Sequence, residues 1–189
     1  MKKSREETIL TRERILASAA RRFRESGFDG VSVKDLMHEA GLTHGAFYAH
    51  FPSKDALIGA ACTAAFSESA NQYGPRAEEG RPDAVRRFLE RYLSKAHLEA
   101  PGSGCMVPAL AAEASRGSAE VQRTFSHGIA AMIDRLADVT PGDEAHARRQ
   151  RAIATLAEAV GAVVLARALE PGELQDSVLE AVRQHLLKP

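Results

Sequence analysis

Residues 41–57, "GLTHGAFYAHFPSKDAL", interrupt a chain that otherwise consists of Ala-, Leu- and Arg-rich segments with helical periodicity. Gly41 breaks the preceding pattern, and Thr43 occupies the position of a helix N-cap before a short aromatic helix at about 44–51. Pro52 stops that helix, and Ser53 caps a further one that we expect to run to about residue 72. The stretch therefore predicts two helix starts in close succession.

The residues before this stretch complete a helix-turn-helix pattern. Ser32 caps a helix at about 33–40, and the helix 44–51 follows after a glycine-containing turn. In such a motif the second helix presents its N-terminal residues to the DNA major groove. The seam between the two helices is apolar and consists of Val33, Leu36, Met37, Ala40, Leu42 and Phe47. From spacing alone, DNA binding and an ordinary pair of packed helices are about equally supported.

The rest of the chain predicts an all-α protein. Val and Ile are sparse and never alternate over a strand-length run, whereas strong helix formers dominate. We expect nine helices, of which the first four are at about 6–26, 33–40, 44–51 and from Ser53 to 72, and the last five at about 83–99, 106–116, 119–138, 144–169 and 173–187. A polar loop is expected at 74–82. The pattern divides the chain into domains 1–54, with the helix-turn-helix at about 32–51, and 55–189.

Charge and cysteine content exclude few functions. Lys+Arg and Asp+Glu both number 25, but residues 1–54 hold ten basic and seven acidic side chains. A basic N-terminal part fits nucleic-acid binding, and ordinary solvated helix faces explain it equally well. Two cysteines do not form a disulfide framework, and the start, "MKKSREETIL", lacks the apolar core of a signal peptide. The apolar segment 152–169 contains Glu158 and Arg167, so we expect a cytoplasmic protein with no membrane span.

Residues 11–58 resemble the N-terminal domain of the TetR family of transcriptional regulators. The matching segment is "RILASAARRFRESGFDGVSVKDLMHEAGLTHGAFYAHFPSKDAL". Its most specific part is Tyr-x-His-Phe, followed after Pro52 by Ser-Lys-x-x-Leu. The resemblance implies a nine-helix, two-domain TetR-like fold. It also implies a homodimer that binds a palindromic DNA operator, most often as a repressor, and that a small-molecule effector releases.

The expected DNA contacts come from the residues and from the resemblance. Ser32 and Lys34 are placed to touch the DNA backbone. The resemblance assigns recognition-helix positions to Thr43, His44, Gly45, Tyr48 and His50, and a phosphate contact to Lys54. Lys54 also begins a helix, whose N-terminus favours phosphate. His44 replaces a frequent Lys or Arg and Ala49 a frequent larger polar residue, so the operator sequence does not follow.

The segment 152–169 is apolar around most of its helical circumference, so it must be buried on several sides. Small residues such as Ala157 and Gly161 permit close approach of another helix. A dimer interface and a central core helix of a monomer both explain this. The resemblance implies that the last two helices form a four-helix bundle with their counterparts. The expected interface residues are Leu156, Val160, Val163, Val164, Val178 and Val182.

The resemblance also implies an effector pocket among the helices of 83–138. Candidate lining residues are Phe66, Phe88, Tyr92, Met106, Leu110, Phe125, Ile129 and Met132, with His97, Glu113, Arg116 and His127 as polar groups. Each lining residue fits an ordinary core position as well. Cys105 stands at a helix start, where the dipole lowers a thiol pKa. A redox- or electrophile-sensing thiol is therefore an alternative to a small buried hydrophobe, whereas Cys62 is expected in the core.

No motif in the sequence predicts an enzyme. The chain lacks metal-ligand spacing, a phosphate-binding glycine loop and a nucleophile elbow, so we expect no catalytic residue, metal or cofactor. His38 and His44 in "HEAGLTH" are separated by a glycine turn and do not share a helical face. An all-α interaction scaffold without DNA binding is the remaining alternative to a regulator.

Overall fold

The computed structural model describes residues 5–76 and 81–188, and every regular element in these two stretches is a helix. In chain order the elements are α1 (Arg5–Ser26), α2 (Val33–Glu39), the 3₁₀ helix η1 (His44–Ala49), α3 (Lys54–Tyr73), α4 (Arg81–Tyr92), α5 (Lys95–Glu99), the 3₁₀ helix η3 (Pro101–Ser103), α6 (Met106–Ala114), α7 (Ala119–Val139), α8 (Ala145–Ala168) and α9 (Glu173–Leu187). The all-α prediction is confirmed. Within the described stretches, no helix has the length and apolar character needed to span a membrane.

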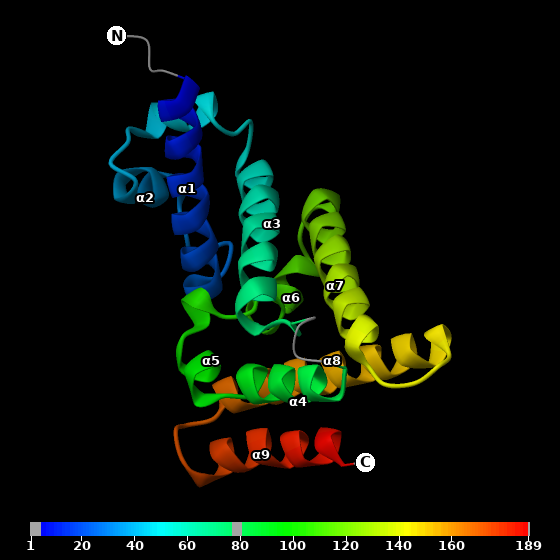
Figure 1. Ribbon diagram of the computed structural model, residues 1–189. Helices are drawn as coiled ribbons and strands as arrows, with labels where there is room; N and C mark the ends of the chain where they lie inside the picture. The colour runs from blue at the N-terminus through cyan, green and yellow to red at the C-terminus, as the bar shows by residue number, and fades with distance from the viewer. Residues whose placement is uncertain (1–4, 77–80, 189) are drawn as a thin grey trace.

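The helices form a chain of packed neighbours. Helix α1 packs along α3, α3 along α7, α7 against α8, and α8 along α9. Figure 1 shows α1, α2 and η1 at one end of the molecule, while α4, α8 and α9 lie at the other end. The short helix α6 lies between the two ends and contacts α1, α3, α7 and α8. Because α3 begins beside η1 and ends beside α4, it connects both ends.

Helix α1 ends just before a glycine in the left-handed conformation. Gly27 has φ +76° and its N–H bonds the carbonyl of Phe23 at 2.8 Å. The chain then turns back, so that the Phe28 ring packs edge-on against Phe23 with ring centroids 5.6 Å apart. This aromatic pair is buried and fixes the exit of α1.

The turn between α2 and η1 has the geometry of a Schellman helix end. Gly41 has φ +70°, its N–H bonds the His38 carbonyl at 3.0 Å, and the Leu42 N–H bonds the Met37 carbonyl at 2.8 Å. These bonds satisfy carbonyls that the end of α2 would otherwise leave without partners. The predicted helix-turn-helix connection is therefore present at Gly41.

Side-chain caps fix the helix starts on either side of this turn. Ser32 Oγ accepts the N–H of Asp35 at 3.1 Å and donates to its carboxylate at 2.6 Å. Ser53 Oγ accepts the N–H of Ala56 at 3.0 Å. Both predicted caps are confirmed, whereas Thr43 makes no side-chain capping hydrogen bond and η1 is a 3₁₀ helix.

One predicted helix is wrong. The region 83–99 consists of two helices, α4 and α5, which are separated at Leu93 and Ser94. Ser94 Oγ accepts the N–H of His97 at 3.2 Å and donates to the Arg91 carbonyl at 2.8 Å, so it caps a new helix in place of continuing α4. Helix α4 also begins earlier than expected, at Arg81, and residues 77–80 of the predicted loop lie outside the described residues.

We expect Gly41→Ala to lower the free energy of unfolding by about 1–2 kcal/mol, because φ is positive there and a Cβ strains the left-handed conformation. Gly45→Ala is the matched control, since Gly45 has no positive φ and a Cβ at either glycine meets no atom within 4 Å. Urea denaturation measures both variants. Equal stability of the two would contradict the role given to Gly41.

Candidate functional site

Two buried rings hold η1 in place. Phe47 and Phe51 stack with centroids 5.8 Å apart and an interplanar angle of 28°, and both are buried. The Arg12 guanidinium of α1 lies over the Phe51 ring, 4.9 Å from its centroid, which adds a cation–π contact. Together these contacts fix the short 3₁₀ helix on α1. A 3₁₀ helix of six residues needs such support because its own hydrogen bonds are weak.

The outer side of η1 is exposed. Tyr48 is 67% exposed, although its ring packs edge-on against Phe47 at 5.2 Å and against His44 at 6.3 Å. Thr43, His44 and Gly45 are exposed as well. The rings therefore hold Tyr48 in a defined position while leaving its hydroxyl and one face to solvent. A large aromatic side chain in this state is characteristic of a binding surface.

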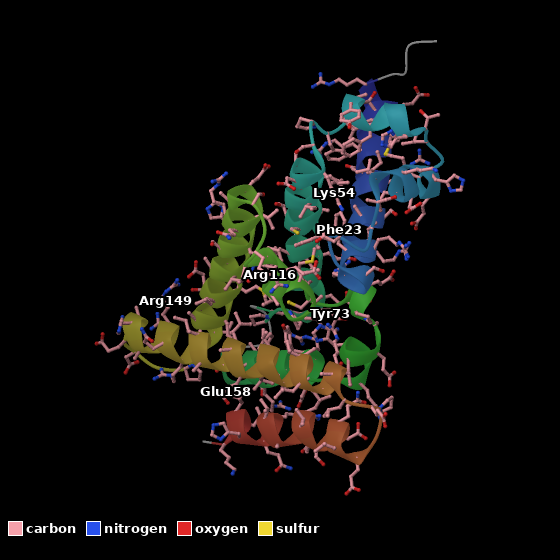
Figure 2. The ribbon with its side chains drawn as sticks, turned by 180° about the vertical axis from the view of Figure 1, so that it is seen from behind. Phe23, Lys54, Tyr73, Arg116, Arg149 and Glu158 are labelled. Carbon is pink, nitrogen blue, oxygen red and sulfur yellow. The ribbon has the colours of Figure 1, made fainter. Side chains whose placement is uncertain are left out.

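The eight predicted DNA-contact residues lie on three neighbouring elements at one end of the molecule (Figure 1). We refer to them as the recognition surface, which consists of Ser32, Lys34, Thr43, His44, Gly45, Tyr48, His50 and Lys54. Lys54 is the first residue of α3 and projects near the start of that helix in Figure 2. His50 and Lys54 are half-buried and the other six are exposed. Their contact with DNA stays a prediction.

Two buried polar contacts tie α1 to the second half of the chain, and the sequence did not indicate their partners. Arg24, whose side chain is 2% exposed, donates to the Gly104 carbonyl at 2.8 Å and to Glu68 of α3 at 2.9 Å. Glu113 of α6 accepts the N–H of Phe28 at 2.6 Å. Glu113 was expected as a polar group of the effector pocket, and it instead binds the backbone beyond α1.

A small cavity lies where α3, α4, α7 and α8 meet. Its volume is about 20 Å³, which is room for roughly one water molecule. Three of the predicted pocket residues, Phe88, Tyr92 and Met132, line it. A more open groove of about 350 Å³ runs between α3 and α7 and is lined by Phe66, Met132 and the predicted polar residue His127.

The cavity and the groove adjoin, because Ala70, Met132 and Arg135 line both. Phe125 and Ile129 face a different hollow on α7, beside α6.

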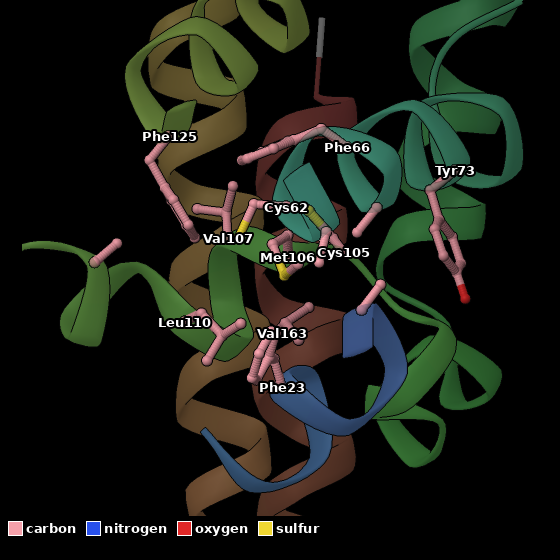
Figure 3. Close-up of a cluster of buried hydrophobic side chains, with 14 of the residues drawn as sticks. Phe23, Cys62, Phe66, Tyr73, Cys105, Met106, Val107, Leu110, Phe125 and Val163 are labelled. Carbon is pink, nitrogen blue, oxygen red and sulfur yellow. The ribbon is translucent and has the colours of Figure 1, made fainter. Parts of the chain in front are cut away.

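Two further predicted pocket residues lie away from both spaces. Met106 and Leu110 are buried in the core beside Cys62, as Figure 3 shows, and line neither the cavity nor the groove. They belong to α6, whose position at the centre of the molecule surrounds them with protein. Arg116 is exposed just after α6 and also lines neither space.

Cys105 is the N-cap residue of α6, as predicted, but its pKa is not lowered. The thiol is fully buried, and that burial raises its pKa above the usual value. His97 holds the segment in place: its Nδ1–H donates to the Tyr92 carbonyl at 2.6 Å and its Nε2 accepts the Cys105 N–H at 2.9 Å. Burial lowers the pKa of His97 to about 4, so the ring is neutral at pH 7. His97 is therefore a structural bridge.

The expected interface residues fall into two groups. Leu156 and Val163 are buried within the protomer, and Leu156 lines the cavity. Their part in a dimer interface stays a prediction. Val160, Val178 and Val182 are half-buried, and Val164 is 44% exposed.

One face of α8 carries small and apolar side chains that are exposed or half-buried, because they recur at a spacing of three and four residues. We call this face the α8 stripe, and it consists of Ile153, Ala157, Val160, Gly161, Val164, Leu165 and Ala168.

We expect neither cysteine to react with a thiol reagent in the folded protein at pH 8. Both thiols are buried, and burial raises the pKa of Cys62 to about 12 and that of Cys105 above its usual value, so the reactive thiolate is scarce. Absorbance after addition of an aromatic disulfide reagent measures the reaction, and denaturant should release both thiols. Fast reaction of Cys105 in native buffer would contradict the structure.

Comparisons with known proteins agree with this arrangement. The family described as "Bacterial regulatory proteins, tetR family" matches residues 15–61, which run from the middle of α1 into α3. A solved TetR transcriptional regulator from Chloroflexus aurantiacus J-10-fl superposes with a TM-score of 0.79 at 26% identity and covers 96% of this chain and 94% of that one. The reduced form of Escherichia coli NemR superposes with a TM-score of 0.75 at 23% identity, over 93% and 94%. The predicted two-domain fold is confirmed.

Curated relatives match over different lengths. The HTH-type transcriptional regulator Rv0196 of Mycobacterium tuberculosis (strain ATCC 25618 / H37Rv) is 28% identical over 93% of this chain and 94% of its own length. The HTH-type transcriptional repressor DhaR of Mycobacterium sp. (strain GP1) is 29% identical over 104 residues, or 55% of this chain. The match spans 52% of DhaR and only 21% of the regulator YerO of Bacillus subtilis (strain 168). The chain thus spans about half the length of DhaR and a fifth of that of YerO in these matches.

Proposed function

Since the chain belongs to the TetR family of transcriptional regulators, we propose that it represses transcription in the cytoplasm by binding a palindromic DNA operator as a homodimer. A small-molecule effector then releases the protein from the DNA. The recognition surface carries this proposal, because an exposed Tyr48 stands on buried rings at the turn of a helix-turn-helix. An interaction scaffold would not need this surface.

In this proposal η1 enters the major groove. The hydroxyl of Thr43 and the ring of His44 reach base edges or phosphates, and the exposed Tyr48 ring contacts a thymine methyl group. Lys54 and the N-terminus of α3 bind a backbone phosphate from the side. Gly45 lets the backbone of η1 approach the DNA closely, since no side chain intervenes there.

The α8 stripe supports the homodimer. Leu165 is 60% exposed and Val164 44%, and an apolar surface of this kind is stabilised by a second copy. Gly161 and Ala157 allow close helix packing within the same stripe. A two-fold axis through α8 and α9 would place two recognition surfaces on successive major grooves, about 34–36 Å apart.

Release depends on α3. We assign residues 1–54 to the DNA-binding domain and 55–189 to the effector-binding and dimerisation domain, so that α3 begins at the boundary. Tyr73 at the far end of α3 lines the cavity, and Lys54 at its start faces the DNA. An effector that enlarges the cavity tilts α3 and changes the spacing of the two recognition surfaces. Thiol sensing by Cys105 is the less favoured mechanism, because burial raises the pKa of that thiol.

We expect the protein to bind DNA from upstream of its own gene, and Tyr48→Ala and Thr43→Ala to weaken specific binding at least tenfold. Lys54→Gln should weaken specific and non-specific binding alike and lower the salt slope by about 1 per protomer, because one phosphate contact is lost. Fluorescence anisotropy over a salt series measures both effects. Arg116→Gln removes an exposed arginine away from the recognition surface and is the control.

This function would be refuted if the unaltered protein showed no salt-sensitive, palindrome-specific binding. It would also be refuted if Arg116→Gln lowered the affinity and the salt slope as much as Lys54→Gln.

For the dimer, we expect Leu165→Glu to give a monomer, because it places a charge in the apolar α8 stripe. Leu10→Glu makes the same change at another exposed leucine, on α1, and should leave the mass unchanged. Light scattering coupled to size-exclusion chromatography gives the molar mass. A dimer that persists in Leu165→Glu would place the interface elsewhere.

A further inference from the structure

We propose that the effector is a small organic anion, an apolar molecule whose carboxylate accepts a hydrogen bond from the buried hydroxyl of Tyr92. This inference rests on the effector-controlled regulator proposed above and adds the chemical class of the effector. It comes from three features around the cavity: a buried hydroxyl without an oxygen or nitrogen partner, a cation without a carboxylate partner, and an opening at which none of the described lining residues is acidic.

The Tyr92 hydroxyl is a buried donor that has no oxygen or nitrogen acceptor among the described residues. Tyr92 is fully buried and lines the cavity, and its hydroxyl has no oxygen or nitrogen partner among the described residues. The one polar group that interacts with it there is the thiol of Cys105, a weak hydrogen-bond partner that also lines the cavity. Buried hydroxyls nearly always have a partner, because an unpaired one loses its hydration without compensation. Its ring is fixed by contacts with Phe88, Tyr73 and His97, whose centroids lie 5.3, 6.4 and 4.7 Å away. The hydroxyl is therefore held in place for a ligand acceptor.

The cation is Arg167 of α8. Its Nε and one terminal nitrogen donate to the carbonyls of Leu98, at 3.3 Å, and His97, at 2.8 Å, while the other terminal nitrogen is buried without a partner. Among the described residues no carboxylate pairs with it. Its charge acts on Tyr92 and Cys105, since it lowers the pKa of both groups against the larger effect of burial. A carboxylate beside Tyr92 would supply the missing negative charge.

The titratable groups beside the cavity do not supply this negative charge. Burial raises the pKa of Cys105 and lowers that of His97, so the thiol and the imidazole are both neutral at pH 7. Burial also raises the pKa of Tyr73, so its phenol is neutral. Arg24 and Glu68, which also act on Tyr73, pair with each other at 2.9 Å. Arg167 is therefore a charged group near the cavity that lacks a carboxylate partner among the described residues.

The groove that adjoins the cavity also favours a negatively charged ligand. Arg135 lines both the cavity and the groove, and none of the residues of 5–76 and 81–188 that line either space is acidic. The walls between them are apolar and include Met132, Leu136 and Phe66. Met132 borders both spaces, and its flexible side chain can move aside for a ligand. A ligand with an apolar body lying towards the groove and a carboxylate at Tyr92 matches this lining.

The test uses benzoate and octanoate as probes, with benzamide and octanamide as neutral counterparts of the same shape. Isothermal titration calorimetry on the full chain should show carboxylate binding that is at least tenfold tighter than amide binding. Tyr92→Phe should weaken carboxylate binding at least tenfold. Ser115→Ala removes an exposed hydroxyl that lines neither the cavity nor the groove, and it should leave carboxylate binding unchanged. Arg135→Gln should weaken carboxylate binding several-fold at low salt and less at high salt.

The proposal would be overturned by equal affinity for acids and amides, by no binding of either acid at millimolar concentration, or by full carboxylate binding in Tyr92→Phe. The last result would mean that water satisfies the hydroxyl. Circular dichroism checks that Tyr92→Phe is folded, and Arg135→Gln tests the charge preference independently of that variant. Operator binding is measured separately. Tyr92-dependent carboxylate binding without operator binding would refute the regulator function alone, whereas operator binding without carboxylate binding would refute this inference alone.

Discussion

One helix shared by both halves of the molecule is the constraint on which the arrangement depends. Helix α3 has 20 residues, so its ends lie about 30 Å apart along a rigid rod. Its first residue, Lys54, belongs to the recognition surface, and its last, Tyr73, lines the cavity. Because α1 and α7 pack on α3 along its length, a tilt at one end moves the other end with it. A small tilt of this long helix would therefore displace the recognition surface when the cavity changes.

Polar contacts join the two halves of the molecule in addition to the packing of α3. Arg24 cannot leave the Gly104 carbonyl and Glu68 without exposing a buried guanidinium to an apolar environment, which is costly. The N–H of Phe28 similarly depends on the Glu113 carboxylate. These contacts join α1 to α3, α6 and the segment before Cys105. In the proposed mechanism these contacts would carry a change at the cavity to the recognition surface.

The parts of the structure that depend on local signals could be predicted from the sequence. Gly41, Ser32 and Ser53 act on their own neighbouring backbone, so their residue types predicted the turn and both caps. The exposure of Tyr48 could be predicted because the residue resembles a known recognition-helix position. The break at Ser94 was missed because the apolar pattern on both sides of it continues at helical spacing.

The sequence does not indicate which distant neighbour a residue packs against. Segment 152–169 is apolar around most of its circumference, so the sequence could not show that Leu156 and Val163 face their own protomer while Leu165 faces outward. Cys105 occupies a helix start, which predicts a lowered thiol pKa, but its burial depends on distant helices and has the opposite, larger effect. The pairing of Arg24 with Gly104 joins residues 80 positions apart, and no local pattern indicates it.

The central claim is that α3 transmits a change at the cavity to the recognition surface. Ala49 occupies an exposed position of η1, so an Ala49→Cys variant can carry a spin label there. Pulsed electron paramagnetic resonance then measures the distance between the two recognition surfaces of the proposed dimer. The buried native cysteines should remain unlabelled. The account predicts a distance near 34–36 Å without ligand and a shifted distance when saturating benzoate lowers operator affinity. An unchanged distance together with lost operator binding would contradict it.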